Sequence, residues 1–349
     1  MTIKLESLFL IVFGFSYTIA NAQLGGRASY QFLNVPVNSR VAGLGGINVS
    51  QPGVDVNLIT QNPATLSDTL RNNLSINYLP YLADINATMV NYAFNAGNTG
   101  LWGVGMRYFN YGTFSGADLA GNSTGDFKSK EYVFSVAKAH TVNHFTLGAS
   151  LNMAFSQIGA YNSAALLADL GGIFKHPEKD WAIGLVFKNL GVPFKKYVKG
   201  ETVDLPADVQ LGTSFKPEHM PVRMSLTAHH LHKWDIVYDN PNQKTKVDLN
   251  GNVIKERVSF GSKLLCHFAV GAEFLMSKNF QLRAGYNFLR RKELVEESRS
   301  GGAGLSLGGM IRIKYFEFAY TRSFYYIGTG TNHFTLTTDF NRILKKRIG

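Results

Sequence analysis

Residues 145–156, FTLGASLNMAFS, place large apolar side chains at every second position and small or polar ones between them. Successive side chains of a strand point to opposite faces of a sheet, so the pattern predicts a β-strand with one apolar and one polar face. The same period of two recurs in residues 101–108, 209–216, 282–288 and 334–340. Tilted strands of about ten residues are long enough to cross a bilayer. The pattern therefore predicts a transmembrane β-barrel, and a large soluble β-sandwich is the alternative.

The connections between the predicted strands separate these two folds. About fourteen antiparallel strands are predicted, an even number as in single-chain bacterial barrels, at residues 72–80, 85–96, 100–111, 126–139, 143–158, 163–175, 180–190, 205–216, 221–232, 260–277, 279–290, 302–314, 315–325 and 331–340. Every second connection is short, and most of the others are long, at 112–125, 191–204, 233–258 and 291–301. Short turns at one end and long loops at the other are typical of outer-membrane barrels, whereas a sandwich has no reason to alternate in this way.

The first 22 residues predict export. Lys4 precedes an apolar run at residues 8–20, and Ala20-Asn21-Ala22 forms a cleavage site that would leave Gln23 as the mature N-terminus. An uncleaved anchor helix is the alternative. Beyond Ala22 no apolar run approaches 18 residues, so no transmembrane helix is expected. With the barrel pattern, these features predict the cell outer membrane as the location.

The formal charge of +11 raises the question of an anionic partner. An exported chain seldom meets nucleic acid, so we expect no nucleic-acid partner and favour the headgroups of outer-membrane lipid and lipopolysaccharide. The basic residues are dispersed, apart from a short cluster in the tail 341–349, which is expected to be a periplasmic extension. The single Cys266 has no partner for an intramolecular disulfide and is expected to act as a small apolar residue of a strand.

Residues 23–70 have neither strand alternation nor a long amphipathic face, and they are rich in Gly, Asn and Pro. Such a segment cannot bury enough apolar surface to fold alone, so we expect it to fold as a plug inside the polar lumen of a barrel formed by residues 71–340. Gly43, Gly45 and Gly46 are expected to allow tight packing of this plug, and Asn62-Pro63-Ala64 to form a turn within it.

Few residues suggest chemistry. His229, His230 and His232 could contribute to a metal site, but no further ligand follows at a convincing spacing, and a cluster at the barrel rim is the preferred interpretation. No nucleophile, metalloprotease or dinucleotide motif is present, so no enzyme activity, metal or cofactor is predicted. Charged residues within the strands, which would be costly against lipid, are expected to face the lumen; the main candidates are Arg107, Glu273, Arg283 and Asp339.

Two stretches of the plug, NSRVAGLGGINVS and DVNLITQNPATLSD, resemble the N-terminal hatch of FadL-like outer-membrane barrels. Residues 25–50, 81–94 and 107–127 are more narrowly similar to the PorQ family of the Bacteroidetes type IX secretion system. The FadL resemblance implies a fourteen-stranded barrel with a lumenal plug. The PorQ resemblance implies a non-catalytic anchor that holds a PorZ-like surface protein, and through it PorU-like and PorV-like proteins that process secreted cargo and attach it to the cell surface.

Three functional hypotheses follow. The first is this surface-complex anchor, with the long loops as the docking surface. The second is a FadL-type channel for long-chain fatty acids or other hydrophobic solutes, which requires an apolar pocket in the lumen. The Gly, Ser, Thr and charged residues on the predicted lumenal faces argue against it. The third is a soluble exported β-protein.

Overall fold

The computed structural model describes residues 29–200, 203–237, 246–247, 253–254, 259–294, 301–326 and 329–345. The expected export signal, the first plug residues 23–28, most of the loop 233–258 and the last four residues of the basic tail lie outside the described residues.

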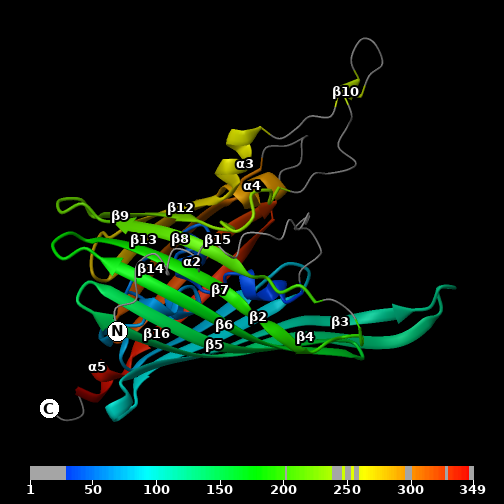
Figure 1. Ribbon diagram of the computed structural model, residues 1–349, viewed down its shortest axis with the longest axis horizontal. Helices are drawn as coiled ribbons and strands as arrows, with labels where there is room; N and C mark the ends of the chain where they lie inside the picture. Colours follow the sequence, from blue (N-terminus) through cyan, green and yellow to red (C-terminus); the bar gives the residue numbers. More distant parts are fainter. Residues whose placement is uncertain are drawn as a thin grey trace, which may run out of the picture.

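Fourteen antiparallel strands form a closed barrel, which confirms the predicted fold class (Figure 1). The ring closes where the first strand, β1 (Asn73–Pro80), pairs with the last, β16 (Thr329–Asp339). Between them the order follows the chain through β2 (Asn86–Asn95), β3 (Leu101–Ala117), β4 (Ser123–Val142), β5 (Phe145–Ile158), β6 (Tyr161–Lys175), β7 (Trp181–Lys195), β8 (Asp208–Phe215), β9 (Val222–Ala228), β12 (Phe268–Phe274), β13 (Phe280–Asn287), β14 (Leu305–Ile313) and β15 (Phe316–Tyr326). A separate two-stranded sheet joins β10 (Lys246–Val247) and β11 (Val253–Ile254).

The alternation in the sequence becomes an inside and an outside of the wall. In β1, Ser75 and Asn77 are fully buried in the lumen, whereas Ile76 and Tyr78 are 44% and 45% exposed on the outer face. Exposed large apolar side chains recur on the outer face of most strands, for example Leu151, Leu211 and Phe318. The barrel thus has an apolar outer surface and a largely polar inner one. No helix in the described ranges is long and apolar enough to cross a membrane.

The two ends of the barrel differ as the sequence predicts. At the short-turn end, the connections are residues 96–100, 143–144, 176–180, 216–221, 275–279 and 314–315. The long-loop end carries residues 196–207, 229–267 and 288–304, together with shorter connections. The helix α5 (Phe340–Lys345) follows the last strand at the short-turn end, and α4 (Phe288–Leu294) begins the loop after β13.

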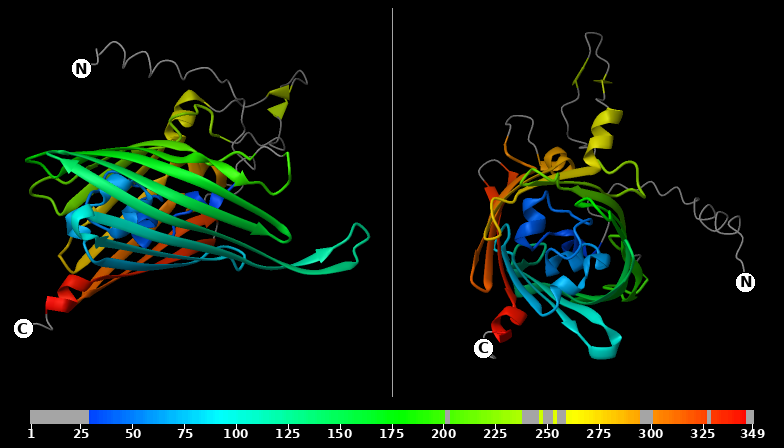
Figure 2. Two further views of the ribbon diagram at one scale, coloured as in Figure 1. Left: turned by 60° about the horizontal axis from the view of Figure 1, so that its bottom comes forward. Right: turned by 90° about the vertical axis from the view of Figure 1, so that its left-hand side faces the viewer.

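Three expectations about the elements are wrong in part. Residues 112–125 are not a long loop, because β3 and β4 remain paired from Thr113↔Lys128 to Ala117↔Ser123 and project as a two-stranded ribbon beyond the rim (Figure 2). The expected strand 221–232 ends at Ala228, since His230 adopts a positive φ of 55°. The expected strand 260–277 begins as the helix α3 (Phe260–Cys266), because the Ser259 hydroxyl caps its N-terminus, so the buried Cys266 lies in a helix.

Candidate functional site: the plug and its lumenal ion cluster

The lumen is filled by residues 29–72, which Figure 2 shows in blue inside the ring of strands. This plug contains only short helices: η1 (Gln31–Asn34), α2 (Ser39–Gly43), η2 (Val56–Thr60), η3 (Pro63–Thr65) and η4 (Asp68–Leu70). Helices this short are unstable alone, so contacts with the wall must hold them. Apolar contacts between plug and wall lie towards the two ends of the plug segment. Phe32 packs among wall residues such as Phe109, and Ile59 packs near Ala93.

The helix α2 is attached to the seam where the barrel closes. The Asn38 side chain caps α2 by accepting a hydrogen bond from Val41 N at 3.0 Å. Its Nδ2 donates to Asn77 Oδ1 of β1 at 3.0 Å and to Thr335 Oγ1 of β16 at 3.3 Å. Asn77 and Thr335 are direct partners across the seam. One plug side chain therefore joins the first and last strands.

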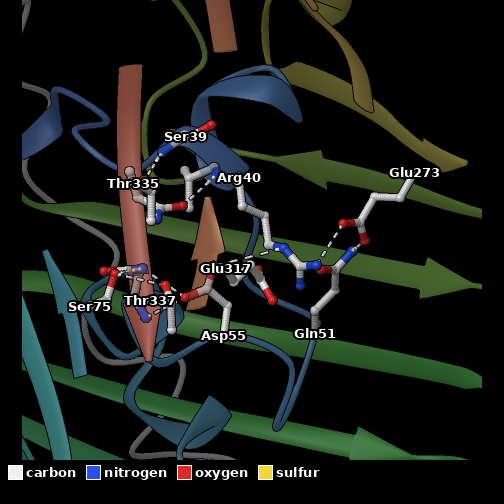
Figure 3. A network of polar contacts seen from close by, with 12 residues as sticks. Ser39, Arg40, Gln51, Asp55, Ser75, Glu273, Glu317, Thr335 and Thr337 are labelled. Carbon is white, nitrogen blue, oxygen red and sulfur yellow. Dashed lines mark hydrogen bonds and ion pairs between the residues drawn. The ribbon is translucent and has the colours of Figure 1, made fainter. Parts of the chain in front are cut away.

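An ion cluster lies beside α2, between the plug and strands β12 and β13 (Figure 3). Arg40 Nη2 lies 3.2 Å from Glu273 Oε1 of β12, and Arg40 Nε lies 3.8 Å from Asp55 Oδ2 of the plug. Arg283 of β13 places its Nε 3.2 Å from the same Glu273 oxygen. The Glu273 carboxylate is fully buried, and Arg40 and Arg283 are 4% and 2% exposed. This plug cluster thus ties α2 to the wall by a buried carboxylate between two guanidinium groups.

Two further residues complete the contacts of Glu273. Gln51 of the plug donates from Nε2 to Glu273 Oε2 at 2.9 Å, and Arg223 Nη1 of β9 lies 3.8 Å from that oxygen. Arg223 also pairs through Nη2 with the half-exposed Asp180 at 2.9 Å, at the short-turn end. Buried charges are stable only when paired and hydrogen-bonded, and removing one partner of such a set typically costs about 3–5 kcal/mol.

The plug lies so close to the wall that several wall positions admit only glycine. A Cβ on Gly171 of β6 would lie 1.9 Å from Asn62 Oδ1, and one on Gly148 of β5 would lie 2.3 Å from Ala64 N. Asn62 caps η3 by accepting from Ala64 N at 3.0 Å, and its Nδ2 donates to Val49 O at 2.9 Å. Asn62, Pro63 and Ala64 therefore form a capped turn pressed against two strands.

The three plug glycines of the sequence analysis lie against the opposite wall. Gly45 has a φ of +88°, and a Cβ there would lie 3.0 Å from Tyr286 O of β13. A Cβ on Gly46 would approach the flexible Arg290 side chain at 2.7 Å, and one on Gly43 would lie 3.0 Å from Thr321 Oγ1. Backbone conformation and close approach both favour glycine at Gly45.

The four predicted lumenal charges do not all meet. Glu273 and Arg283 are register partners and form the core of the plug cluster. Arg107 of β3 is buried elsewhere, where its Nη1 donates to the plug carbonyls of Leu33 at 2.9 Å and Phe32 at 3.3 Å. Asp339 lies at the end of β16 and accepts from Asn341 N at 3.0 Å. Sequence reasoning missed Arg40 and Asp55, although they are the only charged residues between positions 29 and 67.

The histidines form a cluster at the long-loop rim. His229 Nδ1 lies 2.6 Å from His230 Nδ1, and the His230 backbone N–H donates to Asp208 Oδ1 at 2.6 Å. Burial, reinforced by the neighbouring His230 and His267, lowers the pKa of His229 to about 3. Burial also lowers the pKa of His230 and of His232. Among the described residues no group of three or more His, Cys, Asp or Glu side chains has a geometry that could hold a metal ion.

No protein-family model matches the chain, and no curated protein matches it by sequence. Among solved structures, it is similar to a deletion mutant of the TodX monoaromatic hydrocarbon channel, with 14% identity over 86% of this chain and 96% of that chain and a TM-score of 0.49. The Ralstonia pickettii toluene transporter TbuX gives 13% identity over 88% and 98%, with a TM-score of 0.48. A Pseudomonas aeruginosa FadL homologue gives 13% identity over 87% and 98%, with a TM-score of 0.45. At this identity and with TM-scores below 0.5, these similarities carry no argument about what the chain binds.

Proposed function

We propose that the chain is an outer-membrane barrel with a sealed lumen, which acts as an anchor for a protein complex at the cell surface. The apolar outer face of the strands suits a lipid environment. The short-turn end would face the periplasm and the long-loop end the outside, as is usual for such barrels. The surface available to a partner is then the ribbon of β3 and β4 together with the described parts of the connections 196–207 and 229–267.

The observation that carries this proposal is the way the plug is fixed. The plug cluster and the Asn38 contacts hold its middle, and apolar contacts hold it near both ends. Between the plug and strands β2–β7, a cavity of about 30 Å³ lies beside Arg107, which is room for about two water molecules. A larger, open pocket of about 400 Å³ lies at the short-turn end, between plug residues 50–54 and residues 175–182. A conduit needs a continuous path, so a plug held in this way favours an anchor over a transporter.

From the sequence resemblance we also propose that this complex is a surface-attachment complex of the type IX secretion system. The direct partner of the anchor would be a PorZ-like surface protein, with PorU-like and PorV-like proteins bound indirectly. The anchor itself would supply no catalytic residue.

The test is to shorten the ribbon by replacing residues 113–127 with a tight turn. The strand ladder below Asn110 is unaffected by this change, so the barrel should still insert and keep its heat-modifiable mobility on gels. Affinity purification from outer membranes should recover a surface partner with the intact chain and much less with the shortened one. Undiminished recovery would exclude the ribbon as the docking surface, and the absence of any partner with the intact chain would refute the anchor.

A channel for hydrophobic solutes is the second candidate, and one observation favours it. The first residues of the plug, including Tyr30, Phe32 and Leu33, pack against apolar wall residues such as Met89 and Leu167. If these plug residues withdrew, the same wall would offer an apolar pocket. Uptake of a labelled long-chain fatty acid into cells or liposomes that depends on this protein would favour the channel. A sealed anchor should give no uptake above that of empty liposomes.

A further inference from the structure

The barrel wall is much lower on one side than on the other. Strands β9 and β12 have seven residues each, whereas β3 has seventeen and β4 has twenty. A seven-residue strand is about 23 Å long, and at a tilt of about 40° it spans about 18 Å of an apolar band that is about 25 Å high. On this side the strands alone do not cover the apolar layer, so the residues that follow them must meet lipid.

An exposed apolar patch occupies this position. It consists of Leu231 and Trp234 after β9 and of Phe260, Leu264 and Leu265 in α3, which are between 40% and 70% exposed. We call these five residues the α3 platform. Figure 1 shows α3 at the ends of β9 and β12, and the end-on view of Figure 2 shows it in yellow outside the ring of strands. The platform therefore faces away from the lumen, towards the surroundings of the barrel.

The platform is held firmly to the strand ends. The Trp234 ring lies 5.0 Å from the Phe260 ring and stacks on His267 at 5.8 Å. The buried His267 bonds through Nδ1 to His229 O at 2.8 Å and through Nε2 to Trp234 O at 3.1 Å. Because these contacts fix the backbone, the apolar side chains are presented outward even though few neighbours cover them.

Basic residues accompany the apolar ones. Lys233 precedes Trp234, Lys263 lies within α3, and Lys292 lies in α4, which contacts α3. Lys263 pairs with the exposed Asp235 at 2.5 Å. Aromatic rings beside lysines are typical of surfaces that rest in a membrane interface, where acyl chains meet the rings and phosphates meet the ammonium groups.

We infer that the α3 platform binds anionic, phosphate-bearing lipid of the outer leaflet, and that it completes the apolar belt where β9 and β12 end. This inference rests on the proposed membrane location. The acyl chains would contact Trp234, Phe260 and the two leucines of α3, and the lipid phosphate would lie near Lys233 and Lys263. An interfacial segment of this kind enters the headgroup and acyl boundary by about 5–10 Å.

The chain has three tryptophans, so the test can use fluorescence. The double variant Trp102→Phe/Trp181→Phe leaves Trp234 as the only tryptophan of the chain. Trp102 is a matched reference, because its neighbour Gly103 faces the plug and Trp102 therefore lies on the outer face of β3 at the short-turn end. Proteins with Trp234 or Trp102 alone would be reconstituted into vesicles of phosphatidylcholine or phosphatidylglycerol brominated in the acyl chains. Insertion would be verified by heat-modifiable gel mobility and resistance to carbonate extraction.

Brominated acyl chains should reduce the emission of Trp234 by about two-fold. The reduction should be comparable to that of Trp102, as expected for a ring at the acyl boundary. The loss should be larger in phosphatidylglycerol than in phosphatidylcholine, and Lys233→Gln/Lys263→Gln should remove that difference. If the double tryptophan variant failed to insert, the emission lost on bromination would be compared between the unmodified chain and Trp234→Phe.

Two results would overturn the inference while leaving the membrane barrel intact. The first is an inserted protein in which Trp234 is quenched by aqueous iodide but not by brominated lipid. The second is a Trp234 shielded from both quenchers, which would show that protein covers the platform. Both lipids carry a phosphate but only phosphatidylglycerol has a net negative charge, so equal quenching in the two lipids would refute the preference for anionic headgroups. Failure of the unmodified chain to insert at all would instead refute the proposed function.

Discussion

Replacing Glu273 by Gln should release the plug without unfolding the barrel. Glu273 is fully buried and lies within 4 Å of the guanidinium groups of Arg40, Arg223 and Arg283. The amide keeps the shape of the carboxylate but removes its charge, which leaves Arg40 with Asp55 at 3.8 Å and Arg223 with Asp180, and deprives the buried Arg283 of its paired carboxylate. Breaking a buried pair in this way costs about 3–5 kcal/mol. Since each 1.36 kcal/mol corresponds to a factor of ten, the equilibrium for plug opening should shift by at least about 100-fold.

Hydrogen exchange of the inserted protein would measure this shift. Amides of the plug, residues 38–66, should lose protection in Glu273→Gln, while those of β4 and β5 should keep it, because their ladder of backbone hydrogen bonds is untouched. Asp235→Asn is the matched control, since Asp235 is 59% exposed in its pair with Lys263, and exposed pairs contribute at most about 1 kcal/mol. Unchanged plug protection in Glu273→Gln would refute the idea that the plug cluster holds the plug. Equal loss of protection in plug and strands would show that plug and barrel unfold together.

Three further predictions concern other contacts of the plug and rim. Gly45→Val should destabilise the plug by more than about 1 kcal/mol, because it combines an unfavourable positive φ with a clash at Tyr286 O. Limited proteolysis within residues 38–66 should therefore become faster. An unchanged rate of proteolysis would indicate that the segment is a free linker. Asn62→Ala removes the cap of η3 and the hydrogen bond to Val49 O. It should shift the plug-opening equilibrium measured by hydrogen exchange by about 1–2 kcal/mol. Thr60→Ala, which removes a half-buried hydroxyl, is the control and should cost less. The lowered pKa of His229 means that the folded rim favours the neutral ring. The stability of the rim should therefore be complete above about pH 6.5 and should fall as the pH drops towards 3, and His229 alone accounts for at most about 1.4 kcal/mol per pH unit. Exchange of α3 amides at pH 5 and 7 should show this fall. His229→Gln should reduce the dependence, and the remainder should come from His230 and His232, whose pKa values are also lowered by burial.

The wall of the barrel was predictable because period-two alternation is a local property of the sequence. It marks both the strands and the face that each residue takes, as Ser75 and Ile76 show. The ribbon at residues 112–125 was missed because its glycines and polar residues are typical of loops. Two-stranded extensions outside a barrel bury little, so their strands carry no hydrophobic pattern that would reveal them.

The plug cluster was only partly accessible from sequence. Glu273 and Arg283 were noticeable because a charge within an apolar strand must avoid lipid. Arg40 joins them across more than 200 residues, and nothing local indicates such a contact. The usable signal was composition: a lone Arg and a lone Asp in a segment expected inside a lumen need partners there. The sequence predicts a strand through the rim histidines because the positive φ at His230 has no marker in the sequence.

The contacts of Asn38 have a consequence for how the molecule is assembled. Its amide bonds to Asn77 of the first strand and to Thr335 of the last, which are themselves paired. Seating the plug and closing the ring are thus linked equilibria, and each favours the other by the same free energy. A barrel whose first and last strands separated would therefore lose contacts of its plug as well, and a barrel without its plug would lose a side chain that spans its seam.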